Sequence, residues 1–205
     1  GTIPLPSMDA AYMIDATTGY IKLSKFSSTT YKEFMRAMEE LQAKGLKALV
    51  LDLRNNGGGL MDEATKIADE FLDGNKLIVY TEGTNTPKRE YRASKEGVFE
   101  TGKLSVLVDE LSASASEVLA GALQDWDRAT IIGRRTFGKG LVQEQYQLSD
   151  GSALRLTVAR YYTPIGRSIQ RPYAEGKKVY MDDLYNRYES GEMYSTDSIK
   201  FNGKQ

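Results

Sequence analysis

Hydrophobic residues along this chain recur in two spacings, one typical of strands and one typical of helices. Short apolar runs with the length of buried strands occupy residues 20–23, 49–53, 77–80, 104–108 and 130–133. Apolar residues three or four positions apart, as on one face of a helix, occupy residues 30–44, 61–72 and 116–127. Strands and helices that alternate in this way predict an α/β fold.

The rest of the chain shows two further patterns. Residues 141–148 and 153–162 alternate like strands around a turn at 149–151, which predicts an added β-hairpin. Residues 84–95 are polar and read as an exposed loop or hairpin. Beyond Pro172 the sequence is weakly periodic, so we expect one domain over residues 1–172 and a peripheral, truncated segment over 173–205.

Composition narrows the function classes. The chain has 205 residues, 40% of them hydrophobic, which is enough for a buried core. The charges of the 27 basic and 28 acidic residues nearly cancel. The sequence has no stripe of basic residues of the kind that binds nucleic acid, so we do not expect nucleic acid as a partner. No apolar run approaches the ~20 residues that span a bilayer. Because the chain opens with Gly1, we expect an excised piece, with any signal or membrane anchor in a missing N-terminus.

The sequence contains no histidine and no cysteine. A Ser-His-Asp triad, a cysteine nucleophile and a thiolate zinc site are therefore excluded, and we expect no metal or cofactor. If the chain catalyses acyl transfer, a lysine must act as the base for a serine.

The first candidate site is the glycine loop, residues 55–59, which follows a buried strand and precedes a helix. Ligands bind at that edge of open α/β sheets. Consecutive glycines let backbone N–H groups approach an oxyanion, and three are more than a plain tight connection needs.

The second candidate is Ser112-Ala113-Ser114-Ala115-Ser116-Glu117, at another strand-to-helix junction. Serine is a favoured helix N-cap, which explains one of the three serines but not the repeat. A serine nucleophile at such a turn is exposed above the sheet, and the next backbone N–H helps to hold the oxyanion.

The third candidate is Lys139, which lies between Gly138 and Gly140. A lysine is ordinarily a solvated surface charge, and it becomes a general base only where desolvation lowers its pKa. We expect burial beside Phe137 to supply that desolvation. Residues 133–139 also fit a phosphate-loop pattern, but Gly140 and the strand-like sequence after it do not.

Together these segments resemble the C-terminal processing peptidases, also called tail-specific proteases. The resemblance covers roughly residues 17–172, with the motifs in matching order. It is carried by residues 51–59, 112–117, 120–125, 136–140 and 142–143.

The resemblance implies a serine nucleophile at Ser114 and a lysine base at Lys139, with Gln143 orienting that lysine by a hydrogen bond. It also implies a crotonase/Clp-protease-like spiral of ββα units. The expected substrates are protein or peptide C-termini. The expected location of the full-length protein is extracytoplasmic, in the periplasm or cell envelope.

The same resemblance implies an oxyanion hole made by the N–H of Ala115 and one N–H of the glycine loop, from Gly59 or Gly58. Three features depart from the family pattern. Nothing in the given sequence resembles the PDZ domain that usually lies before the core, Leu111 stands where the family pattern favours glycine, and Gln205 comes before the expected closing strand. We therefore expect a trimmed catalytic core.

The leading hypothesis is a serine endopeptidase that cleaves proteins near their C-termini through a Ser-Lys dyad. One alternative is a non-catalytic peptide-binding or scaffold core, in which the edge at Tyr80 and Thr81 accepts an extended peptide. Another is a crotonase-like thioester enzyme that holds an enolate with the same amide pair. The oligomeric state stays open.

Overall fold

The computed structural model describes residues 5–173 and 176–195. The chain separates into two compact units, Gly1–Gln170 and Arg171–Gln205. Among the described residues, no helix combines the length and the apolar character that crossing a bilayer requires.

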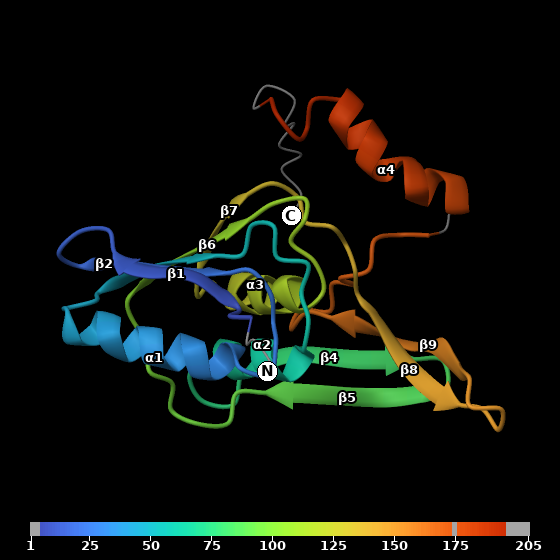
Figure 1. Ribbon diagram of the computed structural model, residues 1–205, viewed down its shortest axis with the longest axis horizontal. Coiled ribbons are helices and arrows are strands. Elements are labelled where there is room, and N and C mark those ends of the chain that lie inside the picture. Colours follow the sequence, from blue (N-terminus) through green and yellow to red (C-terminus); the bar gives the residue numbers. More distant parts are fainter. Residues whose placement is uncertain (1–4, 174–175, 196–205) are drawn as a thin grey trace. The chain divides into compact units, whose positions relative to one another are not determined.

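The first unit contains a mixed five-stranded sheet (Figure 1). Its order is β1-β2-β3-β6-β7, with strands β1 (Met8–Met13), β2 (Thr18–Leu23), β3 (Ala48–Asp52), β6 (Lys103–Val108) and β7 (Thr130–Gly133). β1 is antiparallel to β2, and the other neighbours are parallel. Because β3 and β6 are parallel neighbours, the loops that follow them emerge at the same edge of the sheet.

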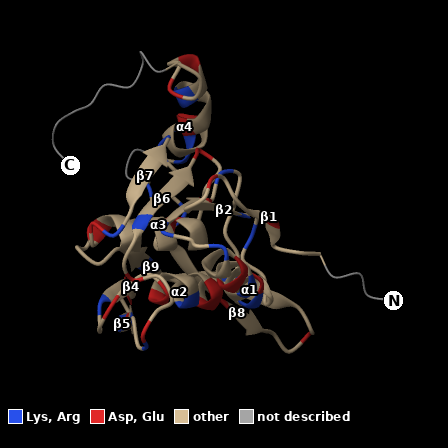
Figure 2. Ribbon diagram, turned by 90° about the vertical axis from the view of Figure 1, so that its left-hand side faces the viewer, with Lys and Arg blue, Asp and Glu red and all other residues tan. Residues whose placement is uncertain are grey.

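Three helices of this unit pack beside the sheet: α1 (Thr30–Ala43), α2 (Met61–Asp69) and α3 (Ala115–Asp125). Figure 2 shows α3 between β6 and β7 above and β4 and β9 below. Every residue from 115 to 123 is buried, as expected for a helix enclosed on several sides. This enclosure fixes the N-terminus of α3, where Ser114 lies.

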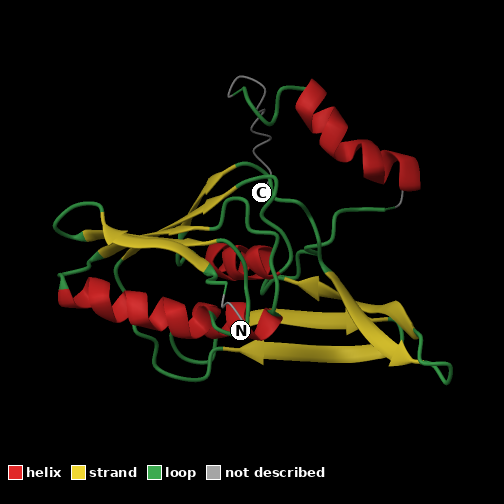
Figure 3. Ribbon diagram, in the orientation of Figure 1, coloured by secondary structure: helices red, strands yellow, loops and turns green. Residues whose placement is uncertain are grey.

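A second, four-stranded sheet is antiparallel throughout (Figure 3). Its order is β5-β4-β9-β8, with strands β4 (Leu77–Gly83), β5 (Thr86–Arg92), β8 (Leu141–Gln147) and β9 (Ala153–Tyr162). β4 pairs with β5 on one side and, through Tyr80 and Thr81, with β9 on the other. The prediction of a peptide-accepting edge at Tyr80 and Thr81 is therefore wrong, because those backbone groups already bond within the sheet.

The second unit contains α4 (Lys177–Glu189). Ion pairs Arg171–Asp183 (2.6 Å) and Arg187–Glu192 (2.8 Å) tie this helix to the residues that flank it. The sequence predicted only a peripheral segment here.

The prediction of an α/β fold with an added hairpin is confirmed, since parallel and antiparallel strands combine with helices and residues 141–162 form β8 and β9. The crotonase-like spiral stays a prediction. β8 begins directly after Gly140, where a phosphate loop would begin a helix.

Candidate active site

The glycine loop after β3 and the serine turn after β6 (residues 109–114) are joined by hydrogen bonds. Ala113 N donates to Asn56 O at 3.0 Å. Ser116 Oγ donates to the same carbonyl oxygen at 2.9 Å, and Ser112 Oγ donates to Leu53 O at 2.8 Å. These contacts hold the two loops as one rigid edge.

The three serines of the turn have different environments. Ser112 and Ser116 are both 0% exposed, and their hydroxyls are used in the contacts just described. Ser114 is partly exposed and has φ 58° and ψ −114°. A non-glycine residue in the left-handed region costs free energy and is typical of a functional turn. The geometry therefore separates Ser114 from its neighbours.

Gly58 packs directly against Ser114. It has φ 93°, and a Cβ at this position would lie 2.6 Å from Ala113 O and 2.8 Å from Ser114 Cβ. Gly59, with φ 144°, packs against the Phe26 carbonyl in the same way, because a Cβ there would lie 2.1 Å from Phe26 O. Only glycine lets the loop come this close.

Hydrogen bonding distinguishes the backbone amides around Ser114. Gly58 N donates to Asn56 Oδ1 at 2.9 Å, and the buried Asn56 side chain is anchored by Nδ2 to Leu23 O. No acceptor for the N–H of Gly59 or of Ala115 occurs within the described part of the chain. Gly59 is exposed and Ala115 is buried, and both amides keep a free N–H among the described contacts, whereas the Gly58 amide is already engaged.

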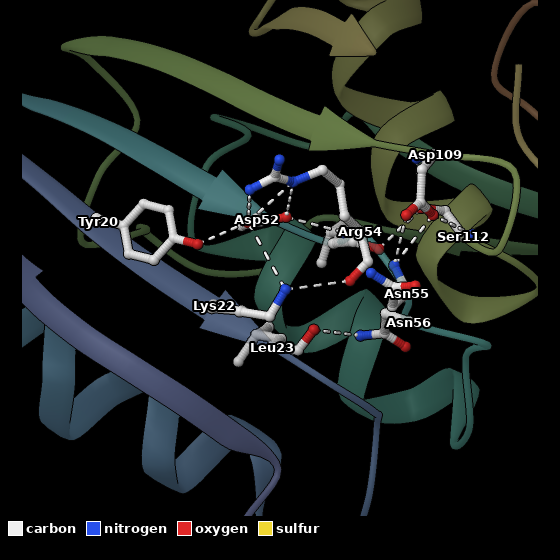
Figure 4. Close-up of polar contacts among 10 residues, drawn as sticks. Tyr20, Lys22, Leu23, Asp52, Arg54, Asn55, Asn56, Asp109 and Ser112 are labelled. Atoms are coloured by element: carbon white, nitrogen blue, oxygen red, sulfur yellow. Dashed lines mark hydrogen bonds and ion pairs between the residues drawn. The ribbon is translucent and has the colours of Figure 1, made fainter. Parts of the chain in front are cut away.

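Two buried aspartates, Asp52 and Asp109, hold this edge of the sheet through hydrogen bonds (Figure 4). Asp109 accepts hydrogen bonds at 3.0 Å from the N–H groups of Asn55, Leu111 and Ser112. Leu111 stands at the position where the sequence pattern favours glycine. Its backbone N–H bonds to Asp109 while its side chain is exposed, so the turn accommodates it. Asp109 fixes both loops at once.

Asp52, at the end of β3, accepts hydrogen bonds of 2.6 Å from the Tyr20 hydroxyl and from Arg54 Nη2. Burial alone would raise the pKa of Asp52, but the hydrogen bonds from Arg54 and Tyr20 outweigh it and lower the pKa to about 2. Burial and the bond to Asp52 raise the pKa of Tyr20 to about 12. Asp52 is therefore an ionised brace for Arg54, the residue just before the glycine loop.

Glu117 was not predicted as a site residue, yet it connects the serine turn to the lysine loop (residues 136–139). It is 6% exposed and lies in the first turn of α3. Its carboxylate accepts hydrogen bonds from Ser114 N (2.8 Å), Gly138 N (2.6 Å), Lys139 N (2.8 Å) and Thr136 Oγ1 (2.7 Å). The Ser-x-x-Glu spacing of a capping box is the sequence signal that could have identified it.

The structure brings the backbone of Lys139 to Glu117, but the Lys139 side chain is exposed. The burial expected beside Phe137 is therefore not found, because the glycines around Lys139 place it on a surface loop. Gln143 is also exposed, on β8 opposite Thr157. Its predicted hydrogen bond to Lys139 is not among the contacts of the described residues.

The described residues contain no group of three or more acidic side chains that could hold a metal ion. The polar groups at the site are hydroxyls, amides, one lysine and carboxylates that already accept several bonds. This set suits nucleophilic attack with amide stabilisation of an oxyanion.

The known proteins that this chain resembles are peptidases. The peptidase family S41 model matches residues 17–176. The carboxyl-terminal-processing protease of Synechocystis is 44% identical over 155 residues, which are 76% of this chain and 36% of that protein. Carboxyl-terminal-processing peptidase 3, chloroplastic, of Arabidopsis thaliana is 45% identical over 152 residues, 73% of this chain and 29% of that protein.

Among solved structures, a photosystem II D1 C-terminal processing protease matches with a TM-score of 0.69 and 44% identity, over 74% of this chain and 39% of that one. The chain thus spans about a third of the length of the curated relatives. The resemblance to C-terminal processing peptidases is confirmed, and the chain belongs to peptidase family S41.

Proposed function

We propose that this chain is the catalytic core of a serine endopeptidase that cleaves protein substrates near their C-termini. One observation carries the proposal: the partly exposed Ser114, in a left-handed turn, is coupled through Glu117 to the backbone of Lys139. That backbone connection supports a pairing of Ser114 with Lys139 as nucleophile and base in a chain without histidine.

In the proposed reaction, neutral Lys139 Nζ takes the proton of Ser114 Oγ as Oγ attacks the scissile carbonyl carbon. The C–N bond then breaks, and the protonated lysine gives its proton to the leaving amine. Water next attacks the ester with Lys139 as base, which releases the new C-terminus and restores Ser114.

The oxyanion would be held by the N–H groups of Ala115 and Gly59. Gly59 is favoured over Gly58 because the Gly58 amide already donates to Asn56 Oδ1. Two amide donors aimed at a developing negative charge supply a large part of the rate in acyl transfer.

The exposed Lys139 requires a source of desolvation, which we assign to the bound substrate. A peptide laid over the loop would exclude water from Nζ and favour the neutral amine. Gln143, four residues further on, would orient the amine in that complex.

The substrate and location follow from the family rather than from the site. We propose protein or peptide C-termini as substrates, since the relatives' names describe C-terminal processing. We also propose an extracytoplasmic location for the full-length protein.

The test is cleavage of a protein substrate by the full-length protein and two serine variants. Ser114→Ala should lose turnover and keep its folding. Ser112→Ala, which removes a buried hydrogen bond to Leu53 O, should keep turnover but lose about 1–3 kcal/mol of unfolding free energy. Loss of cleavage in Ser112→Ala with full activity in Ser114→Ala would refute the assignment.

The exposed Lys139 favours one alternative, a core that binds peptides without cleaving them. In that case the wild-type protein would bind a C-terminal peptide and leave it intact through long incubation. Cleavage that depends on Ser114 excludes this reading.

A further inference from the structure

The residue after Lys139 is held by the last residue of the first unit. Gly140 N donates to Gln170 Oε1 at 3.1 Å, and Tyr161 N donates to Gly140 O at 2.8 Å. We propose that Gln170 is a positioning residue for the base, which fixes Lys139 from its C-terminal side as Glu117 fixes it from its N-terminal side. The proposal rests on the proposed function and adds to it a residue outside the serine turn and the lysine loop.

The contact between Gly140 and Gln170 depends on close packing. A Cβ at Gly140 would lie 2.5 Å from Gln170 N and 2.8 Å from Ile169 Cβ. Both distances are too short for atoms that are not bonded, so any side chain at position 140 would push the two segments apart. The glycine therefore keeps the Gln170 side chain within reach of the backbone next to Lys139.

Gln170 follows a turn that is closed by backbone hydrogen bonds at the end of β9. Thr163 N donates to Arg167 O at 2.9 Å. Ile169 N then donates to Tyr161 O at 3.1 Å, which brings the chain back beside β9. The turn is thus a fixed extension of β9, and it determines where Gln170 lies.

The same turn is tied to the helix that carries the nucleophile. Arg167 forms an ion pair with Asp125, whose side chain is 1% exposed, and donates to Gln124 Oε1 at 3.0 Å. Ile165 N donates to Asp125 Oδ2 at 3.2 Å. Asp125 is the last residue of α3, and Ser114 is the N-cap of that helix. The nucleophile and the turn before Gln170 therefore share one frame.

Holding the base from both sides matters because Lys139 lies between two glycines, which allow the backbone more freedom than other residues. Glu117 holds the N–H groups of Gly138 and Lys139, and Gln170 holds the N–H group of Gly140. A general base acts only within hydrogen-bond reach of the proton that it takes. Loss of one hold would widen the range of positions of Nζ and make the productive one rarer.

The experiment measures the rate at which a fluorophosphonate labels Ser114 in the full-length protein. Gln170→Asn shortens the side chain by one methylene group, so its oxygen no longer reaches Gly140 N. We expect labelling about ten-fold slower, and kcat for a peptide to fall with little change in KM. Gln170→Glu keeps the length and an acceptor oxygen. It should label at the wild-type rate on the high-pH plateau, where Lys139 is neutral in both proteins.

The matched control is Gln147→Asn, the same change at an exposed position of β8, which should label normally. A double variant tests whether Gln170 acts through the base. Adding Gln170→Asn to Lys139→Ala should slow labelling no further than Lys139→Ala alone. General damage to the fold would slow it again.

Two results would overturn the role of Gln170 while leaving the proposed function intact. One is wild-type labelling in Gln170→Asn, and the other is further slowing in the double variant. If Gln170→Asn does not fold, Gln170→Glu decides, because slow labelling on its plateau would equally refute the contact. Labelling that is as fast in Lys139→Ala as in the wild-type protein would instead refute the Ser-Lys dyad itself.

Discussion

At the scale of single residues, the close approach of Gly58 to Ser114 constrains the site directly. Gly58→Ala would strain a backbone with φ 93° and push the new methyl against Ala113 O. We expect kcat/KM to fall about 100-fold or more, because Ser114 and the Ala115 amide must both move. Gly57→Ala is the matched control, since a Cβ there meets nothing within 4 Å. Equal activity in the two variants would contradict the proposed packing role.

The Asp52 brace predicts how stability changes in acid. The pKa of Asp52 in the folded protein is about 2, below its ordinary value of 3.8. A lowered pKa means that Asp52 stabilises the fold above pH 3.8 and loses that effect as the pH falls through about 2. Asp52→Asn should cost about 2 kcal/mol near neutrality, where the charged hydrogen bonds are lost.

Urea denaturation of wild-type protein and Asp52→Asn at several pH values measures this effect. The gap between their unfolding free energies should shrink as the pH falls from 3.8 toward 2. A gap that stays constant over this range would show that Asp52 is not the titrating brace.

Single residues also show which features of the site the sequence alone does not predict. The Ser114 assignment came from a resemblance, and the structure adds a physical distinction, because Ser112 and Ser116 are buried and bonded. The exposure of Lys139 was not predictable, since burial depends on loops far apart in the chain. Glu117 was missed because the Ser114-x-x-Glu117 spacing indicates only its bond to Ser114 N, whereas its other three partners lie in a loop about twenty residues away.

At the scale of elements, Glu117 joins the start of α3 to the lysine loop. Glu117→Gln keeps the size of the side chain but turns one acceptor oxygen into a donor that faces N–H groups. We expect kcat to fall by about ten-fold or more and the unfolding free energy to fall by about 1–3 kcal/mol.

The control for Glu117→Gln is Glu39→Gln, which makes the same change on an exposed face of α1. Steady-state kinetics and urea denaturation should show no effect there. A Glu117→Gln protein with wild-type kcat would mean that the lysine loop does not depend on this carboxylate.

Long periodic elements were the easiest to predict. The helices α1, α2 and α3 and the strands of the parallel core follow from their apolar spacing. β1 was missed because Met8–Met13 shows no clear alternation, and α4 because its face is mixed. β5 is a full strand although it contains Pro87, which is tolerated because β5 is an edge strand.

At the scale of the whole molecule, chain order predicts which strands of the parallel core are neighbours, because helical crossovers link them. Chain order does not predict that β4 pairs with β9, about eighty residues later. Because of this pairing, Tyr80 and Thr81 do not form the peptide-binding edge that the sequence predicted. Long-range antiparallel pairing depends on packing of the finished fold rather than on any local signal.

The central claim is that a neutral Lys139 activates Ser114. The most direct measurement is the rate at which a fluorophosphonate labels the full-length protein, with mapping of the modified residue. The account predicts one adduct, at Ser114, formed far more slowly in Lys139→Ala and at the normal rate in the control Lys103→Ala. An adduct at another serine, or labelling of Ser114 at the same rate without Lys139, would contradict it.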